Sequence, residues 1–259
     1  MVRRGVLGTA LLACGVSAVA LSGCRGAVAE DAARKPAANS PRELVVFVYD
    51  RSTSIPDHSL ALARDLTNGR IDQLDHGDRI AALQVLQLSL SEPPQRWSQA
   101  VPEREWENQE IARDSVQRVR FLRDAQDFLA SYSDTTGRSG ITWTDVLSTL
   151  HDVGEELRPY GDHEVTVYVF SDMLQSTPAI EMEGLRRMPD EHWVKEKYAK
   201  GMLPDLDGLC VVVVGARVDT DASQRVKRFW KEYFEVTGAT LLDRNFTLRP
   251  VTLSERPCS

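Results

Sequence analysis

The chain has 259 residues, of which 42% are hydrophobic and 27% charged, and its formal net charge is -7. This balance is typical of a folded globular protein and argues against a wholly disordered chain. The acidic composition also argues against nonspecific binding to nucleic acid, because such binding requires a basic surface.

The N-terminal segment has the layout of a processing signal. Two arginines precede an apolar stretch at 5–21, which is short for a transmembrane helix. The stretch ends in Leu-Ser-Gly-Cys at 21–24, which resembles the lipobox of bacterial lipoproteins, where cleavage exposes a cysteine that carries lipid. We therefore expect a signal peptide at 1–24, a lipid anchor on Cys24, and a location in the bacterial cell envelope that faces the periplasm or the cell exterior.

Residues 25–42 follow this signal and are rich in alanine, proline, serine and charge, without an apolar period. Such a composition is typical of a flexible tether. We expect it to connect the lipid anchor to one folded domain at 43–259.

The first predicted element of the domain is a buried strand. Residues 45–49 are all apolar or aromatic, and a run without polar alternation suits a central parallel strand that is covered on both faces. The loop after it begins with Asp50, Ser52 and Ser54. In open α/β sheets, binding sites form at the carboxyl edge of such strands.

The rest of the domain alternates predicted helices with predicted strands. Helices are expected at 56–74, 105–132, 144–157 and 224–237, and further strands at 80–86, 164–170, 209–215 and 239–242. Residues 91–102 form a loop or an irregular edge, and about 173–206 form an insertion with a helical patch. The alternation predicts an α/β fold with a doubly wound, mostly parallel sheet and helices on both faces.

One predicted helix, at 105–132, carries apolar residues at three- and four-residue spacing, which predicts that one face packs in the core. These residues are Ala112, Val116, Val119, Leu122, Ala125 and Leu129.

Two of the four cysteines, Cys210 and Cys258, belong to the predicted domain. An oxidising exported compartment permits a disulfide between them, but sequence alone does not set the geometry, so paired and free thiols both stay open. The five histidines show no zinc-ligand spacing. No phosphate-binding glycine loop or Gly-x-Ser-x-Gly motif is present, so nucleophilic catalysis is not favoured.

The loop after the first strand resembles the metal-ion-dependent adhesion site of the von Willebrand factor A domain. Asp50, Ser52 and Ser54 match the Asp-x-Ser-x-Ser motif of that family, and Gly-Asp-Arg-Ile at 77–80 is similar to the beginning of its second major strand. The resemblance spans about 43–243 and implies a von Willebrand factor A or Rossmann-like fold.

Two later motifs extend the resemblance. Thr144 opens a predicted helix where the family has a threonine ligand, although Thr142 also follows a glycine-containing loop and stays an alternative. Ser171 and Asp172 follow the strand at 164–170, where the family has Thr-Asp-Gly. Met173 replaces the glycine of that motif, and with Leu174 it is expected to set apolar bulk beside the metal.

The resemblance implies a site of two carboxylates and three hydroxyls: Asp50, Ser52, Ser54, Thr144 and Asp172. Mg²⁺ prefers six hard oxygen ligands and usually keeps some water, so this set suits it, with Mn²⁺ or Ca²⁺ as alternatives. In the family, an acidic side chain of a partner protein completes the shell. Without a metal, the two serines could cap the next helix and Asp50 could accept hydrogen bonds from its loop.

These features predict an exported, lipid-anchored binding protein that engages a partner protein through a divalent metal and is not an enzyme. The first alternative is a metal-dependent phosphohydrolase or nuclease that uses Asp50, Asp172 and Asp243. Ser52 argues against it, because aspartyl-phosphate hydrolases need a second aspartate at that position. The second alternative is a metal-free structural lipoprotein.

Overall fold

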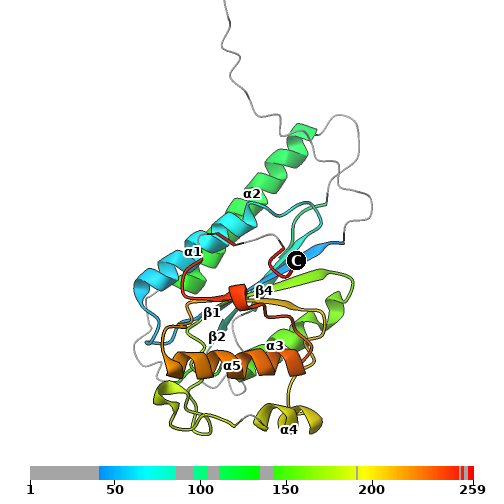
Figure 1. Ribbon diagram of the computed structural model, residues 1–259. Coiled ribbons are helices and arrows are strands. Elements are labelled where there is room, and N and C mark those ends of the chain that lie inside the picture. Colours follow the sequence, from blue (N-terminus) through cyan, green and yellow to red (C-terminus); the bar gives the residue numbers. More distant parts are fainter. Residues whose placement is uncertain are drawn as a thin grey trace, which may run out of the picture. The chain divides into compact units, whose positions relative to one another are not determined.

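The computed structural model (Figure 1) describes residues 41–85, 96–103, 111–134, 143–190, 192–250, 252–253 and 256–259, with the side chains of 111–114 excepted. The predicted signal peptide, the lipid anchor on Cys24 and the tether up to residue 40 lie outside these residues. Pro41–Ser259 forms one compact unit. Among the described helices, none has the length and apolarity needed to cross a membrane.

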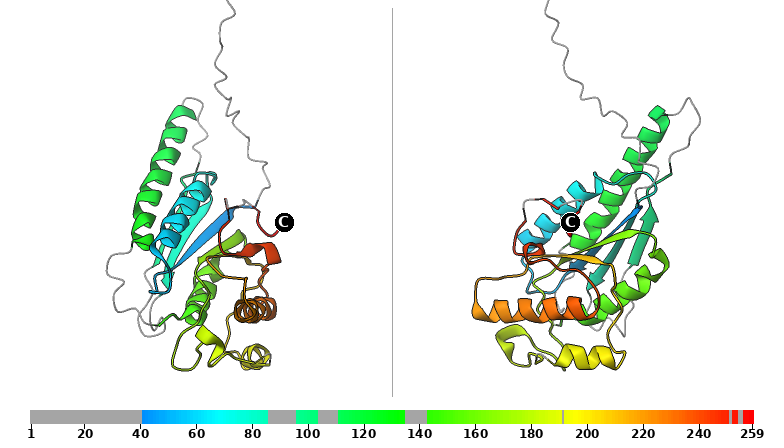
Figure 2. Two further views of the ribbon diagram at one scale, coloured as in Figure 1. Left: turned by 60° about the vertical axis from the view of Figure 1, so that its left-hand side comes forward. Right: turned by 45° about the vertical axis from the view of Figure 1, so that its right-hand side comes forward.

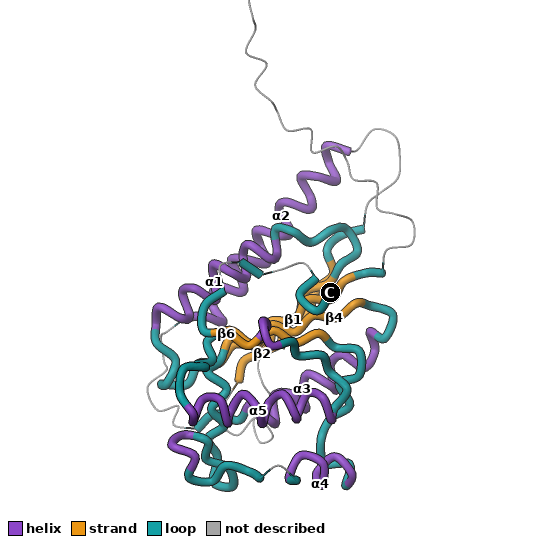
Figure 3. The backbone as a smooth tube through the Cα atoms, in the orientation of Figure 1, coloured by secondary structure: helices purple, strands orange, loops and turns teal. Residues whose placement is uncertain are grey.

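A six-stranded sheet runs through this unit in the order β3-β2-β1-β4-β5-β6 (Figure 3). All neighbouring strands pair in parallel except β2 and β3, which are antiparallel. The strands are β1 Glu43–Asp50, β2 Arg79–Val85, β3 Arg96–Ala100, β4 Glu164–Phe170, β5 Cys210–Val214 and β6 Phe246–Thr247.

Helices cover both faces of the sheet, as Figure 2 shows. They are α1 Asp57–Ile71 and α2 Ile111–Ala130 on one face, α3 Val146–Leu157 and α5 Asp221–Val236 on the other, and α4 Trp193–Ala199 outside α5. Strand β1 is buried from both sides: Val45 and Phe47 pack toward α1 and α2, whereas Val46 and Val48 pack toward α3 and α5. This two-sided burial explains its unbroken apolar run and confirms the predicted doubly wound α/β fold.

Most predicted elements lie close to their expected positions, but the predicted last strand at 239–242 is wrong. Within the described residues of that segment, Thr240 makes one isolated bridge to Cys210, and the paired edge strand is β6. Helix α5 ends at Val236, and Gly238 then turns the chain with a φ of 89°. The residues at 239–242 pass the start of β5, and the strand forms only after a 3-10 turn at Asp243–Asn245. Within the segment at 91–102, which is predicted to be a loop or an irregular edge, β3 forms an edge strand of the sheet.

The predicted core face of α2 is correct in its second half but not at Val116 and Val119, and the side chain of Ala112 lies outside the described residues. Leu122 and Leu129 are buried, whereas Val116 and Val119 are 67% and 60% exposed. The reason is the length of α1: Arg118 donates a hydrogen bond to the carbonyl of Leu74, beyond the end of α1, so the earlier turns of α2 extend past that helix.

The insertion after β4 packs against α5. Val194 of α4 is fully buried, and the Trp193 ring lies 6.0 Å from the Phe229 ring. A disulfide joins Cys210, the first residue of β5, to Cys258, with 5.8 Å between the two Cα atoms. The C-terminal tail is thereby attached to the amino edge of the sheet.

Candidate metal site at the carboxyl edge of the sheet

Two aspartates meet where neighbouring strands end. Asp50 is the last residue of β1, and Asp172 follows β4 by two residues. Strands β1 and β4 are adjacent and parallel, and Tyr49 pairs with Phe170, so the two loops leave the sheet side by side. Asp50 is fully buried, although burying a carboxylate is costly unless polar or charged groups compensate it.

Hydrogen bonds connect three of the five predicted ligands. The backbone N–H of Ser52 donates to Oδ1 of Asp50 at 2.8 Å, and the hydroxyls of Ser52 and Ser54 lie 3.0 Å apart. The Ser54 side chain also interacts with Asp172 and lowers the pKa of its carboxyl. Ser171, which is not among the predicted ligands, donates its hydroxyl to Oδ2 of Asp50 at 2.7 Å. Its signal in the sequence is the match of Ser171 and Asp172 to the Thr-Asp of the family motif at a strand end.

The electrostatics of this cluster favour a cation. Burial raises the pKa of Asp172 to about 6, and the negative charges of Asp50 and Glu183 add to that rise. The hydrogen bond from the Leu174 N–H, at 3.0 Å, and the Ser54 side chain act in the opposite direction. A positive ion between Asp50 and Asp172 would favour the charged form of both groups.

The fifth predicted ligand, Thr144, is held by different contacts. It is buried, with 5% exposed, and its N–H and C=O groups pair with Ser176 at 3.0 and 2.8 Å. The sequence predicts Thr144 in the first turn of a helix, but Thr144 precedes that helix. Asp145 is the N-cap of α3 and accepts a hydrogen bond from the Ser148 N–H at 3.1 Å. Thr142 lies outside the described residues.

Met173 does not place apolar bulk beside the cluster, so that expectation is wrong. Its side chain is fully buried in the core under α5, and its carbonyl accepts a hydrogen bond from the Trp230 indole at 2.8 Å. Its φ of 63° lies in the region that favours glycine. The backbone at Met173 therefore has a conformation that suits glycine, which the motif named in the sequence analysis has at this position. Of Met173 and Leu174, only Leu174 lines the surface cavity described below.

The carboxylate set of the enzyme alternative is not assembled. Asp243 is exposed, forms ion pairs with Lys227 and Lys231 at 3.2 and 3.0 Å, and precedes β6 instead of following a strand. Across the described part of the chain, no group of three or more His, Cys, Asp or Glu side chains is placed to hold a metal. The cluster at Asp50 and Asp172 differs from such a group, because hydroxyls supply much of its oxygen.

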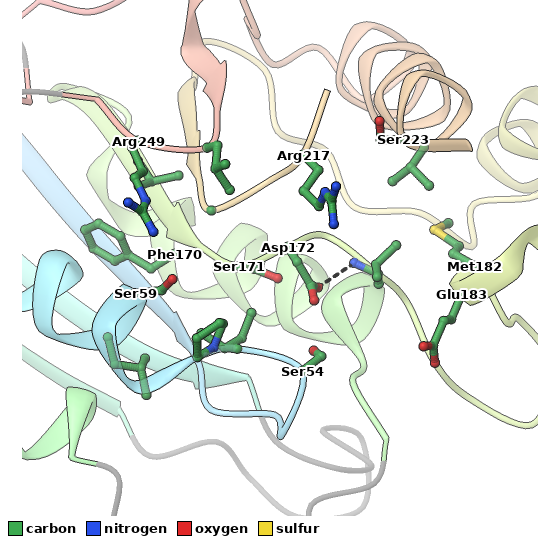
Figure 4. A pocket seen from close by; sticks show the side chains of 18 of the residues that line it. Ser54, Ser59, Phe170, Ser171, Asp172, Met182, Glu183, Arg217, Ser223 and Arg249 are labelled. Atoms are coloured by element: carbon green, nitrogen blue, oxygen red, sulfur yellow. Dashed lines mark hydrogen bonds between the residues drawn. The ribbon is translucent and has the colours of Figure 1, made fainter. Parts of the chain in front are cut away.

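A cavity of about 430 Å³ lies beside the cluster (Figure 4). Ser54 and Asp172 belong to its wall, and Arg217 and Arg249 line it as well. Apolar side chains from four elements and their loops cover much of the remaining wall: Phe170, Leu174, Val214, Val226 and Leu248.

No protein-family model and no curated protein matches the chain. Solved structures with a similar fold include human COPII-coat protein Sec24c, at 11% identity and a TM-score of 0.39 over 82% of this chain and 30% of that one. Manganese-loaded Plasmodium vivax TRAP protein matches at 12% identity and a TM-score of 0.35, over 81% of this chain and 68% of that one. A von Willebrand factor type A structure from Catenulispora acidiphila matches at 12% identity and a TM-score of 0.34, over 77% of this chain and 43% of that one.

The chain thus spans less than two thirds of the Sec24c and Catenulispora chains. These similarities concern the arrangement of strands and helices.

Proposed function

We propose that this domain is a binding module that holds a divalent cation at the carboxyl edge of its sheet and engages an acidic side chain of a partner protein there. The proposed ligands are Asp50, Ser52, Ser54, Thr144 and Asp172. The observation that carries the proposal is the cluster at the ends of β1 and β4: hydrogen bonds join Asp50, Ser52 and Ser54 and connect Asp50 to Ser171, next to Asp172.

The oxygen atoms of this cluster fit Mg²⁺, with Mn²⁺ or Ca²⁺ as alternatives, because hard cations select carboxylate and hydroxyl ligands. The hydrogen bonds from Ser52 and Ser171 orient the Asp50 carboxylate. Each carboxylate oxygen has two acceptor positions, so the same oxygens stay able to contact a metal or one of its waters.

The chain's own residues favour binding over catalysis. Two carboxylates balance the charge of a divalent ion, and the neutral hydroxyls leave a coordination position for an external carboxylate. An external carboxylate would bind by direct coordination to the ion at that position. Ser52 occupies the position where an aspartyl-phosphate hydrolase needs an acid.

The proposed setting is the bacterial cell envelope, with a lipid anchor on Cys24 and a tether at 25–42. The Cys210–Cys258 disulfide supports an exported location, because such bonds persist in oxidising compartments. The alternative of a metal-free structural lipoprotein predicts that chelators change neither stability nor partner binding.

Thermal unfolding of the chain from residue 25 onward tests the metal site. A saturating concentration of Mg²⁺, about 100 times Kd, is expected to add about 2.7 kcal/mol of stability to the wild type and none to Asp50→Ala. Asp243→Ala, a change at an exposed aspartate away from the cluster, serves as the matched control and is expected to keep the full shift. Equal stabilisation of Asp50→Ala and wild type would contradict this assignment.

A further inference from the structure

The cavity beside Asp172 is continuous with the proposed metal site. Ser54 and Asp172 line the cavity and are also two of the proposed ligands. A group that binds a metal at these ligands would therefore lie next to the cavity. The part of the partner beside that group would then be close to the cavity wall.

The wall of this cavity is largely apolar. Phe170 and Val214 come from the ends of β4 and β5, and Val226 comes from α5. Leu248, which follows β6, is 46% exposed and is one of the few large hydrophobic residues on the described surface. A volume of about 430 Å³ lies within the usual range for pockets that bury a small molecule or a large side chain.

Two guanidinium groups stand at the same cavity (Figure 4). Arg217 is exposed and forms a bidentate ion pair with Asp219, at 2.8 and 3.1 Å. Arg249 is exposed and donates a hydrogen bond to Nε2 of His58 at 2.7 Å. In the described part of the chain Arg249 has no carboxylate partner, so its charge is available to an approaching anion.

A bound divalent ion would take up a carboxylate and these arginines would attract negative charge, whereas much of the remaining wall is apolar, with Glu183 the one carboxylate besides Asp172 among its described residues. A small anion alone would leave that wall in water. We infer that the cavity accepts a bulky apolar side chain of the partner, adjacent in the partner to the acidic residue that completes the metal shell. The inference rests on the proposed function and names the chemistry of the partner segment: an acidic residue next to an aromatic or large aliphatic one.

Two carboxylic acids serve as probes because the partner is unidentified. Butanoate supplies a carboxylate with a short chain, and 4-phenylbutanoate adds an aromatic ring at the end of the same chain. In the presence of Mg²⁺, NMR titration of the chain from residue 25 onward is expected to show at least tenfold tighter binding of 4-phenylbutanoate. Burial of the ring supplies the difference, at about 25 cal/mol per Å² of apolar surface.

A variant with a larger side chain in the cavity tests whether the phenyl ring binds there. Ala222 lines the cavity from the exposed start of α5, so Ala222→Trp is expected to remove the tenfold margin and to leave stabilisation by Mg²⁺ unchanged. Ala199→Trp, an equal change at an exposed position at the end of α4, is expected to keep the margin.

The outcomes separate the two proposals. Normal stabilisation by Mg²⁺ with equal affinity for the two acids would overturn this inference alone. A tenfold margin that survives Ala222→Trp would also overturn it, because the ring would then bind elsewhere. Absence of stabilisation by Mg²⁺ in the wild type would overturn the proposed function, and with it the pairing of the cavity with a metal.

Discussion

The two ends of β1 handle buried charge in opposite ways. At the amino end, Glu43 forms an ion pair with Arg70, whose side chain is fully buried and also donates to the Tyr168 hydroxyl. At the carboxyl end, Asp50 and Asp172 carry charge of the same sign. One strand thus begins at a charge pair of opposite signs and ends at two groups that repel each other.

This difference separates structure from function. The pKa of Glu43 is raised by burial, but the contact with Arg70 opposes that rise, so the amino end supplies its own compensation. The pKa of Asp172 is raised by burial and further by Asp50. Sites that proteins reserve for ligands often keep such unfavourable arrangements, because the ligand relieves them. Four changes test the contrast.

The largest effect is expected at the amino end. Arg70→Met removes the buried cation and leaves Glu43 without compensation, so the free energy of unfolding is expected to fall by about 3–5 kcal/mol in urea denaturation. Arg64→Met on the same helix is the control, because Arg64 is exposed and its contact with Asp65 spans 3.9 Å. A loss no larger than that of the control would show that the amino end does not depend on its ion pair.

The disulfide fixes the same edge of the sheet by a covalent bond. Cys258→Ser frees the C-terminal tail from β5 and is expected to lower the free energy of unfolding by about 2–4 kcal/mol, because the bond closes a long loop. The two cysteines are 48 residues apart. Chemical denaturation with and without reductant gives the measurement. A variant as stable as the oxidised wild type would mean that the Arg70 pair holds this edge unaided.

At the carboxyl end, a substitution is expected to raise the free energy of unfolding instead of lowering it. In the metal-free protein, Asp172 has a pKa of about 6, above its usual value of 3.8, so its contribution to stability is present below pH 4 and is lost as the pH rises through 6. Asp172→Asn imitates the neutral carboxyl and is expected to raise stability at pH 7 by about 1–3 kcal/mol. It should flatten the pH dependence between 4 and 7 and eliminate stabilisation by Mg²⁺.

Unfolding curves of wild type and variant at several pH values, in the presence of a chelator, provide this comparison. An Asp172→Asn variant that is less stable than the wild type at pH 7 would contradict the view that the carboxylates of Asp50 and Asp172 repel each other.

The fold and part of the site could be predicted from local patterns. The run at 45–49 indicated burial from both faces, and the positions of Asp50 and Asp172 at strand ends were enough to predict that they meet. Local patterns could not place β6, because a two-residue edge strand depends on pairing with β5 and has no periodicity of its own.

Tertiary contacts decide the remaining differences. The role of Ser171 depends on the distance from its hydroxyl to Asp50 across two strands, which spacing along the chain does not encode. Met173 is predicted to set apolar bulk beside the metal because it replaces the glycine of the family motif, but its side chain, at a positive φ, is buried in the core. Thr144 was expected within a helix, and its pairing with Ser176 of the insertion holds it before the helix instead.

The smallest effect is expected for Thr144, the proposed neutral ligand that comes from a third loop and would complete the metal site at the carboxyl end of β1. Thr144→Val keeps the size of the side chain and the backbone bonds to Ser176 but removes the hydroxyl, so the free energy of unfolding in a chelator should change little. The Kd for Mg²⁺, measured by calorimetry, is expected to rise about tenfold, which corresponds to about 1.4 kcal/mol. Thr142→Val is the matched control and is expected to leave the Kd unchanged. The reverse result, a loss of affinity in Thr142→Val alone, would move the ligand to Thr142, and no effect in either variant would leave the two aspartates and two serines as the whole protein share of the site.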